Sequence, residues 1–151
     1  MIAADYGYLK YLSKEFYHDA TLKDKCGRTV AMLASRYRNI YDLPREFYHD
    51  PTLQDNDGQT VAIIVASYGN IENLPKEFYH DAYIQDKHNR TVAMHVAGCG
   101  YIKNLPREFY HDSMIKGHHG QTVAMFAARW GGIKDLPKVF YHDALLKNNE
   151  D

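Results

Sequence analysis

Residues 55–85 read DNDGQTVAIIVASYGNIENLPKEFYHDAYIQ. The tetrapeptide Phe-Tyr-His-Asp near the end of this stretch occurs five times, at 16–19, 47–50, 78–81, 109–112 and 140–143, with a constant step of 31 residues. Thr-Val-Ala recurs with the same step, at 29–31, 60–62, 91–93 and 122–124. A repeat period of about 20 to 50 residues is typical of arrays in which each unit buries its apolar side chains against its neighbours. The sequence therefore predicts a row of one repeated supersecondary unit.

We expect a single domain that spans residues 1–151. Residues 3–7 align with residues 65–69, so the chain is expected to begin in the middle of a unit. The predicted parts are an N-terminal half repeat at 1–23, full repeats at 24–54, 55–85, 86–116 and 117–147, and a tail at 148–151.

Each unit is predicted to contain two helices joined by loops. Thr60 is a good N-cap for the first helix, and Gly69 is a typical residue at a helix C-terminus. Leu74-Pro75 marks the start of a short second helix, because proline suits the first helical position. A polar turn precedes each first helix, and its fourth residue is Gly or Asn, which tolerate positive φ.

Alignment of the copies predicts which side chains form the core. The aligned apolar positions are Leu9, Ile40, Ile71, Ile102 and Ile133; Leu12, Leu43, Leu74, Leu105 and Leu136; Phe16, Phe47, Phe78, Phe109 and Phe140; and Leu22, Leu53, Ile84, Ile115 and Leu146. Val30, Val61, Val92 and Val123 begin the buried stripe of the first helices, and Met32, Met94 and Met125 are expected to fill gaps in the core.

The order Asp-x-x-Gly-x-Thr, then an alanine-containing helix, then glycine resembles the ankyrin repeat, and Gly58, Thr60 and Gly69 match that family's spacing. The unit departs from the family in its length of 31 rather than about 33 residues, in Val61 where the family has proline, and in Leu-Pro-x-Glu-Phe where it has a leucine pair. The resemblance implies an all-α fold, an ankyrin-like helical-hairpin solenoid of about four and a half 31-residue repeats. The repeat unit resembles the compact ankyrin-like variants seen in bacterial and phage proteins.

Composition narrows the classes of function. Of 151 residues, 45% are hydrophobic and 25% are charged, which argues against a disordered chain. The formal net charge of −1 argues against nucleic acid as the main partner. No stretch is long and apolar enough for a membrane span, and the N-terminus has no secretory core. With only two cysteines, the chain is expected to be cytoplasmic, in the host cytoplasm for a phage-encoded protein.

Histidines are the most catalytic-looking residues. Adjacent His and Asp, as in His80-Asp81, can ligate a metal, but one pair per repeat predicts pairs too far apart to share an ion. We expect the aspartate to bind backbone donors of the next turn instead. His118-His119, with His88 one repeat earlier, could gather a transition metal, although solvated turn residues are commoner. No phosphate-binding, dinucleotide-binding or hydrolase motif is present, so we expect neither a cofactor nor an enzyme.

Positions that differ between copies are the candidates for contact with a partner. Two adjacent columns near the end of the first helix read Tyr6, Tyr37, Tyr68, Cys99, Trp130 and Asp5, Arg36, Ser67, Gly98, Arg129. The resemblance implies that these columns and the turns line a concave binding groove. The predicted partner-binding residues are Tyr37, Tyr68, Cys99, Trp130, Arg36, Arg129, Lys87, His88, His118 and His119. Tyr, Trp and Arg are the residues most enriched at binding hot spots. The alternative is that Tyr37 and Tyr68 only cover neighbouring repeats.

Three hypotheses for the function follow. The leading one is a non-enzymatic protein–protein interaction module, either an inhibitor or a scaffold, such as a phage or bacterial effector that masks a host or defence protein. The second is a structural repeat protein that associates with itself through the uncapped ends of the array, which leaves monomer and homodimer open. The third is a metal-binding protein that uses its histidines.

Overall fold

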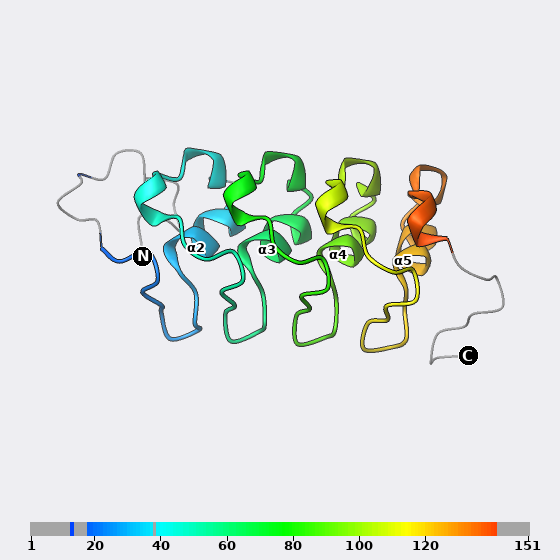
Figure 1. Ribbon diagram of the computed structural model, residues 1–151, viewed down its shortest axis with the longest axis horizontal. Coiled ribbons are helices and arrows are strands. Elements are labelled where there is room, and N and C mark those ends of the chain that lie inside the picture. The colour runs from blue at the N-terminus through cyan, green and yellow to red at the C-terminus, as the bar shows by residue number, and fades with distance from the viewer. Residues whose placement is uncertain (1–12, 14–17, 38, 142–151) are drawn as a thin grey trace.

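The computed structural model describes residues 13, 18–37 and 39–141. These residues form four α-helices at equivalent places in consecutive units: α2 (Val30–Arg36), α3 (Val61–Ser67), α4 (Val92–Gly98) and α5 (Val123–Arg129). Each helix packs on the next, so that the four lie side by side in a row (Figure 1). The described residues contain no strand, which confirms the all-α class. None of the helices in this part of the chain could cross a membrane.

The predicted start and stop of the first helix are confirmed. The Thr60 hydroxyl oxygen accepts a hydrogen bond from the N–H of Ile63 at 3.2 Å, and the threonines that begin the other three helices do the same. Gly69, which follows the C-cap of α3, has a φ of 72°, a left-handed conformation that favours glycine. Gly100 and Gly131 repeat this conformation after α4 and α5.

The prediction of a second α-helix in each unit is wrong. Two single turns of 3-10 helix stand in its place, on either side of the Leu-Pro dipeptide. Their bounds are Ile40–Asp42 and Arg45–Phe47, Ile71–Asn73 and Lys76–Phe78, Ile102–Asn104 and Arg107–Phe109, and Ile133–Asp135 and Lys138–Phe140. Proline disfavours the helical conformation of the residue before it, and Leu74 is accordingly extended, with φ −71° and ψ 122°. Tyr79 is extended as well, so the second 3-10 helix ends after a single turn.

The polar turns are linked to one another along the row. Their fourth residues, Gly27, Gly58, Asn89 and Gly120, all have positive φ, as predicted. Successive turns are joined by backbone hydrogen bonds of 3.0, 2.9 and 2.8 Å, from Asn56 N to Cys26 O, from Lys87 N to Asp57 O and from His118 N to His88 O. In Figure 1 the turns extend on one side of the helices and the 3-10 turns lie on the other. One bond at each step therefore holds the tips of neighbouring turns in register.

Most of the predicted core is buried, and the phenylalanine ladder is completely so: Phe47, Phe78, Phe109 and Phe140 are at most 1% exposed. Two predicted core residues are instead exposed, namely Leu22 and Ile133. Ile133 is 50% exposed because no further described unit follows α5, whereas the next unit covers Ile102 completely. Leu22 belongs to a column at the edge of the unit, where Leu53, Ile84 and Ile115 are only partly buried. The other aligned positions, Leu9, Leu12, Phe16 and Leu146, lie outside the described residues.

Candidate functional site

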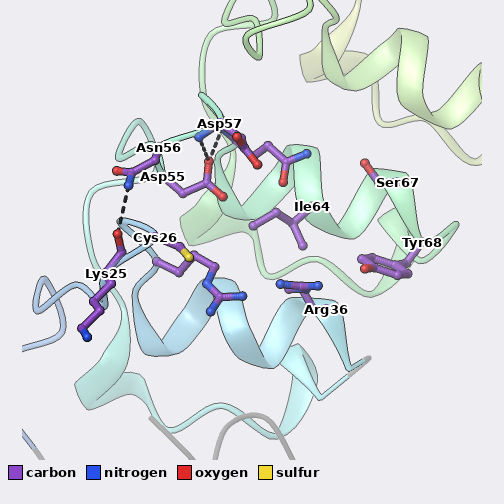
Figure 2. Close-up of a pocket in the computed structure, with 11 residues that line it drawn as sticks. Lys25, Cys26, Arg36, Asp55, Asn56, Asp57, Ile64, Ser67 and Tyr68 are labelled. Carbon is purple, nitrogen blue, oxygen red and sulfur yellow. Dashed lines mark hydrogen bonds between the residues drawn. The ribbon is translucent and has the colours of Figure 1, made fainter.

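A groove runs between the row of α-helices and the row of polar turns. Its first part, of about 530 Å³, lies over α2 and α3 and is shown in Figure 2. A second part of about 540 Å³ lies over α3, α4 and α5 and shares Gln59 and Ser67 with the first. A third part of about 210 Å³ lies beside the last two turns and shares Arg90 and Phe126 with the second. We call these three connected cavities the helix–turn groove.

The groove brings together most of the predicted partner-binding residues. Arg36 and Tyr68 project into its first part from the ends of α2 and α3 (Figure 2). Cys99, Arg129 and Trp130 line its second part, and His88, His118 and His119 line its third. Tyr37 and Lys87 line none of the three cavities. Tyr37, Tyr68 and Trp130 are 49%, 42% and 58% exposed, so large aromatic surfaces are open to a partner.

Some basic residues in or near the groove are bound by carboxylates of this chain. The guanidinium of Arg28 donates two hydrogen bonds to Asp24 Oδ2, at 2.9 and 2.7 Å, and Arg90 donates two to Asp86 Oδ2, at 3.1 and 2.8 Å. Lys87, which was predicted to bind a partner, pairs with Asp57 of the preceding turn. That pair lies beside the backbone bond between the same two residues, so Lys87 helps to hold adjacent turns together.

Arg36 and Arg129 differ from those residues. No carboxylate in the described part of the chain pairs with either guanidinium. The guanidinium of Arg129 lies 5.9 Å from the centre of the Trp130 ring, a distance at which a cation is attracted to the face of an aromatic ring. The two arginines occupy the same column, at the last residue of α2 and of α5, and Ser67 and Gly98 occupy it between them.

Sequence reasoning missed a buried polar network in the floor of the groove. His95 Nδ1 lies 2.8 Å from the Ser67 hydroxyl, and His95 Nε2 lies 3.0 Å from Asp86 Oδ2, which Arg90 also contacts. Burial on its own would raise the pKa of the Asp86 carboxyl. The hydrogen bonds from His95 and from the backbone and side chain of Arg90 outweigh burial and hold that pKa well below its ordinary range. The available signal was His95 itself, a polar residue in a column that otherwise reads Leu33, Ile64 and Phe126.

Ser67, His95 and Asp86 follow one another in the order of a hydrolase triad, but their setting favours a positioning role. Ser67 is the last residue of α3, where the partial negative charge of the helix end would oppose an oxyanion. Its hydroxyl also has a second acceptor, the Ile63 carbonyl at 2.9 Å. The network connects α3, α4 and the turn at 86–90, and so fixes the shape of the groove at its centre.

The repeated histidine–aspartate motif serves the fold. His80 Nε2 contacts the Thr60 hydroxyl and His80 Nδ1 contacts the Asp81 carbonyl oxygen, each at 2.8 Å, while Asp81 Oδ1 accepts from the N–H of Tyr83 at 2.9 Å. The aspartate therefore binds a backbone donor of the next turn, as predicted. Burial lowers the pKa of His80 and of its equivalents His49 and His111.

The described residues give no support to a metal site. Among them, no three His, Cys, Asp or Glu side chains come together in an arrangement that could hold an ion. The rings of His118 and His119 are in edge contact, with centroids 5.0 Å apart. Cys26 and Cys99 are both free thiols, and burial raises the pKa of Cys99.

Comparison with known proteins yields no match, either among protein-family models or among curated proteins.

Proposed function

We propose that this protein is an ankyrin-like helical solenoid that acts as a non-enzymatic protein-binding module through its helix–turn groove. The observation that carries the proposal is the row of exposed aromatic and arginine side chains along the groove. Tyr68 and Trp130 offer large contact areas with few rotatable bonds, and Arg36 and Arg129 stand beside them. In support of the ankyrin-like architecture, turn, capped helix and positive-φ glycine recur in the same order in consecutive stacked units.

The groove suits this role because its framework is rigid before a partner arrives. Backbone bonds link the turns, and the Ser67–His95–Asp86 network ties two helices to one turn. A preorganised surface loses little conformational entropy on binding. The protein would act by steric blocking or by scaffolding in the cytoplasm, as a phage or bacterial effector that masks a host or defence protein.

The test compares groove and non-groove aromatics. Trp130→Ala and Tyr68→Ala should each weaken capture of the native partner about tenfold or more, because hot-spot truncations cost about 2 kcal/mol or more. Melting temperatures should stay close to that of the wild type. Tyr41→Ala is the matched control, since Tyr41 is at least as exposed as Tyr68 and Trp130 but lies in a 3-10 turn outside the helix–turn groove. Affinity would be measured by titration with the partner captured from cell extract. Loss of stability without loss of affinity would instead assign the aromatic row to packing.

One observation favours the second hypothesis, self-association. Ile133 is half exposed at the end of the described row, although its equivalent Ile102 is fully covered by the following unit. An apolar face of that kind is suited to stacking on another unit. Light scattering over a wide range of concentrations tests this candidate, and a constant monomer mass would eliminate it.

A further inference from the structure

We propose that the helix–turn groove receives an acidic, extended segment of the partner protein, with carboxylates of that segment bound by Arg129 and Arg36. This inference rests on the proposed function of the groove and names the chemistry of what the groove binds.

Two guanidinium groups of the groove have bonding capacity left over. Arg36 is partly buried in the first cavity, next to Arg28 and Lys25, and has no carboxylate partner among the described residues. Arg129 is an exposed residue of the second cavity, with its guanidinium carbon 5.9 Å from the centre of the Trp130 ring, and no carboxylate among the described residues binds its N–H groups. Planar guanidinium groups bind carboxylates through two parallel hydrogen bonds, and partial burial, as at Arg36, strengthens these bonds.

The carboxylates near the groove are already engaged. Asp55 Oδ1 accepts the N–H groups of Asp57 and Gln59, at 2.9 and 2.8 Å, and Asp24 and Asp86 accept the corresponding turn N–H groups in their own units. Asp57 binds Lys87. None of the described residues that line the second cavity is acidic. The glutamates that the structure describes lie instead in the 3-10 segments across the helices, at Glu46, Glu72, Glu77 and Glu108. The groove therefore keeps an excess of positive charge that complements an acidic segment.

The middle of the groove is open, which suits an extended chain. Between Arg36 and Arg129 the same column holds Ser67 and Gly98, and Cys99 stands between Tyr68 and Trp130 in the next column. Packing does not require the glycine. A Cβ on Gly98 would meet only Phe126, at an ordinary 3.6 Å, and Gly98 has no positive φ. Gly98 is the last residue of α4, and its missing side chain leaves space over that end of the helix.

The test pans a random dodecapeptide phage library on the immobilised full chain. Three baits are compared: wild type, Arg36→Glu with Arg129→Glu, and Lys134→Glu with Lys138→Glu. The last pair makes the same charge change at exposed positions on the 3-10 turns. We expect Asp and Glu to be enriched on the wild type and on the lysine control, and this enrichment to vanish on the arginine variant. The best acidic peptide, labelled with fluorescein, should bind about tenfold more weakly to the arginine variant and more weakly in high salt. Gly98→Leu should block the same peptide with the fold intact.

Several results would overturn the inference. Peptides with no acidic excess, a failure to enrich any peptide, or equal losses on both charge variants would each do so. Tighter binding of an oligodeoxythymidine than of the acidic peptide, with the same dependence on Arg36 and Arg129, would assign the groove to nucleic acid. The proposed function has its own test. It is wrong if the protein still captures its native partner after Trp130→Ala and after Tyr68→Ala. If capture of the native partner requires both aromatic residues but does not depend on salt or on the two arginines, the proposed function stands and the inference of an acidic segment is wrong.

Discussion

The hydroxyl oxygen of Thr60 lies 2.8 Å from Nε2 of His80, twenty residues further along the chain. His80 Nδ1 faces the Asp81 carbonyl oxygen and donates to it, so Nε2 carries no proton and accepts from the Thr60 hydroxyl. The same hydroxyl oxygen accepts from the N–H of Ile63 at the start of α3. Thr60 therefore caps α3 and also links the start of that helix to the histidine that follows the second 3-10 turn of the same unit. Thr29 with His49 and Thr91 with His111 repeat the contact at the same distance.

Removal of this hydroxyl should be costly. Thr60→Val keeps the shape of the side chain, but it deletes the helix cap and leaves the partly buried Nε2 of His80 without a donor. Loss of an N-cap costs about 1 kcal/mol and an unsatisfied buried acceptor about 1 to 3 kcal/mol, so the free energy of unfolding should fall by about 2 to 4 kcal/mol. Urea denaturation measures the change. Thr60→Ser retains the hydroxyl and should lose less than half as much; equal losses would show that the methyl group matters and the hydrogen bonds do not.

Stability should fall as the solution is acidified below pH 6.5. Burial lowers the folded-state pKa of His49, His80 and His111 below the ordinary histidine pKa of about 6.5. The unfolded chain therefore takes up protons first as the pH falls, and the free energy of unfolding decreases from about pH 6.5 downward. The lowered pKa of Asp50 and Asp86 adds a separate loss only below about pH 3.8. Melting temperatures recorded from pH 8 to pH 4 test the first step.

Histidine variants separate this effect from general acid unfolding. His80→Gln removes one titrating ring and should reduce the dependence of the melting temperature on pH between 6.5 and 4, with partner binding unchanged. An unchanged pH profile, or a wild-type melting temperature that rises on acidification, would contradict the assignment to these histidines.

Phe78 is the central member of the phenylalanine ladder and should tolerate truncation poorly. It is completely buried, and the rings of Tyr48 and His49 of the preceding unit pack on it with centroid distances of 4.9 and 5.5 Å. Phe78→Ala should cost about 3 to 5 kcal/mol, because it leaves a cavity between two units. Lys76→Ala, at an exposed position in the same 3-10 turn, should change stability by less than about 0.5 kcal/mol. A comparable loss in both variants would contradict the role of the ladder.

Features governed by local chemistry could be predicted from the sequence. The threonine caps, the positive φ at Gly58 and Asn89, and the glycine after α3 each follow from the residue and its immediate neighbours. The second helix was predicted wrongly because proline was considered only for its fit to a first helical turn. Pro75 is itself extended, with ψ 138°, and a single 3-10 turn follows it before the chain becomes extended again at Tyr79.

Features that depend on neighbouring units were harder to predict. The exposure of Ile133 follows from its place at the end of the described row, which an alignment of copies treats as equivalent to the middle. The buried network was missed for a related reason. His95 contacts Asp86 in its own unit and Ser67 in another unit, 28 residues away, so half of its hydrogen bonding depends on a neighbouring unit. The columns that line the groove could be found from the sequence because they vary between copies. Only the coordinates show that Arg36 and Arg129 have no carboxylate partner among the described residues.

Substitution of Asp86 should cost much more stability than substitution of His95. Asp86→Ala leaves Arg90 and His95 without their shared acceptor and frees the N–H groups of His88 and Arg90 in the turn, so we expect a loss of about 3 to 5 kcal/mol in urea denaturation. His95→Leu introduces the residue found at the equivalent Leu33, and it leaves Asp86 with Arg90 and two backbone donors. Its effect should stay within about 1 kcal/mol. Asp24→Ala is the matched control, since Asp24 bonds the same kind of turn and Arg28 but lies nearer the surface, and its loss should be intermediate. If His95→Leu were as costly as Asp86→Ala, the histidine would be an essential member of the network, and the turn could not be held by Asp86 and Arg90 alone.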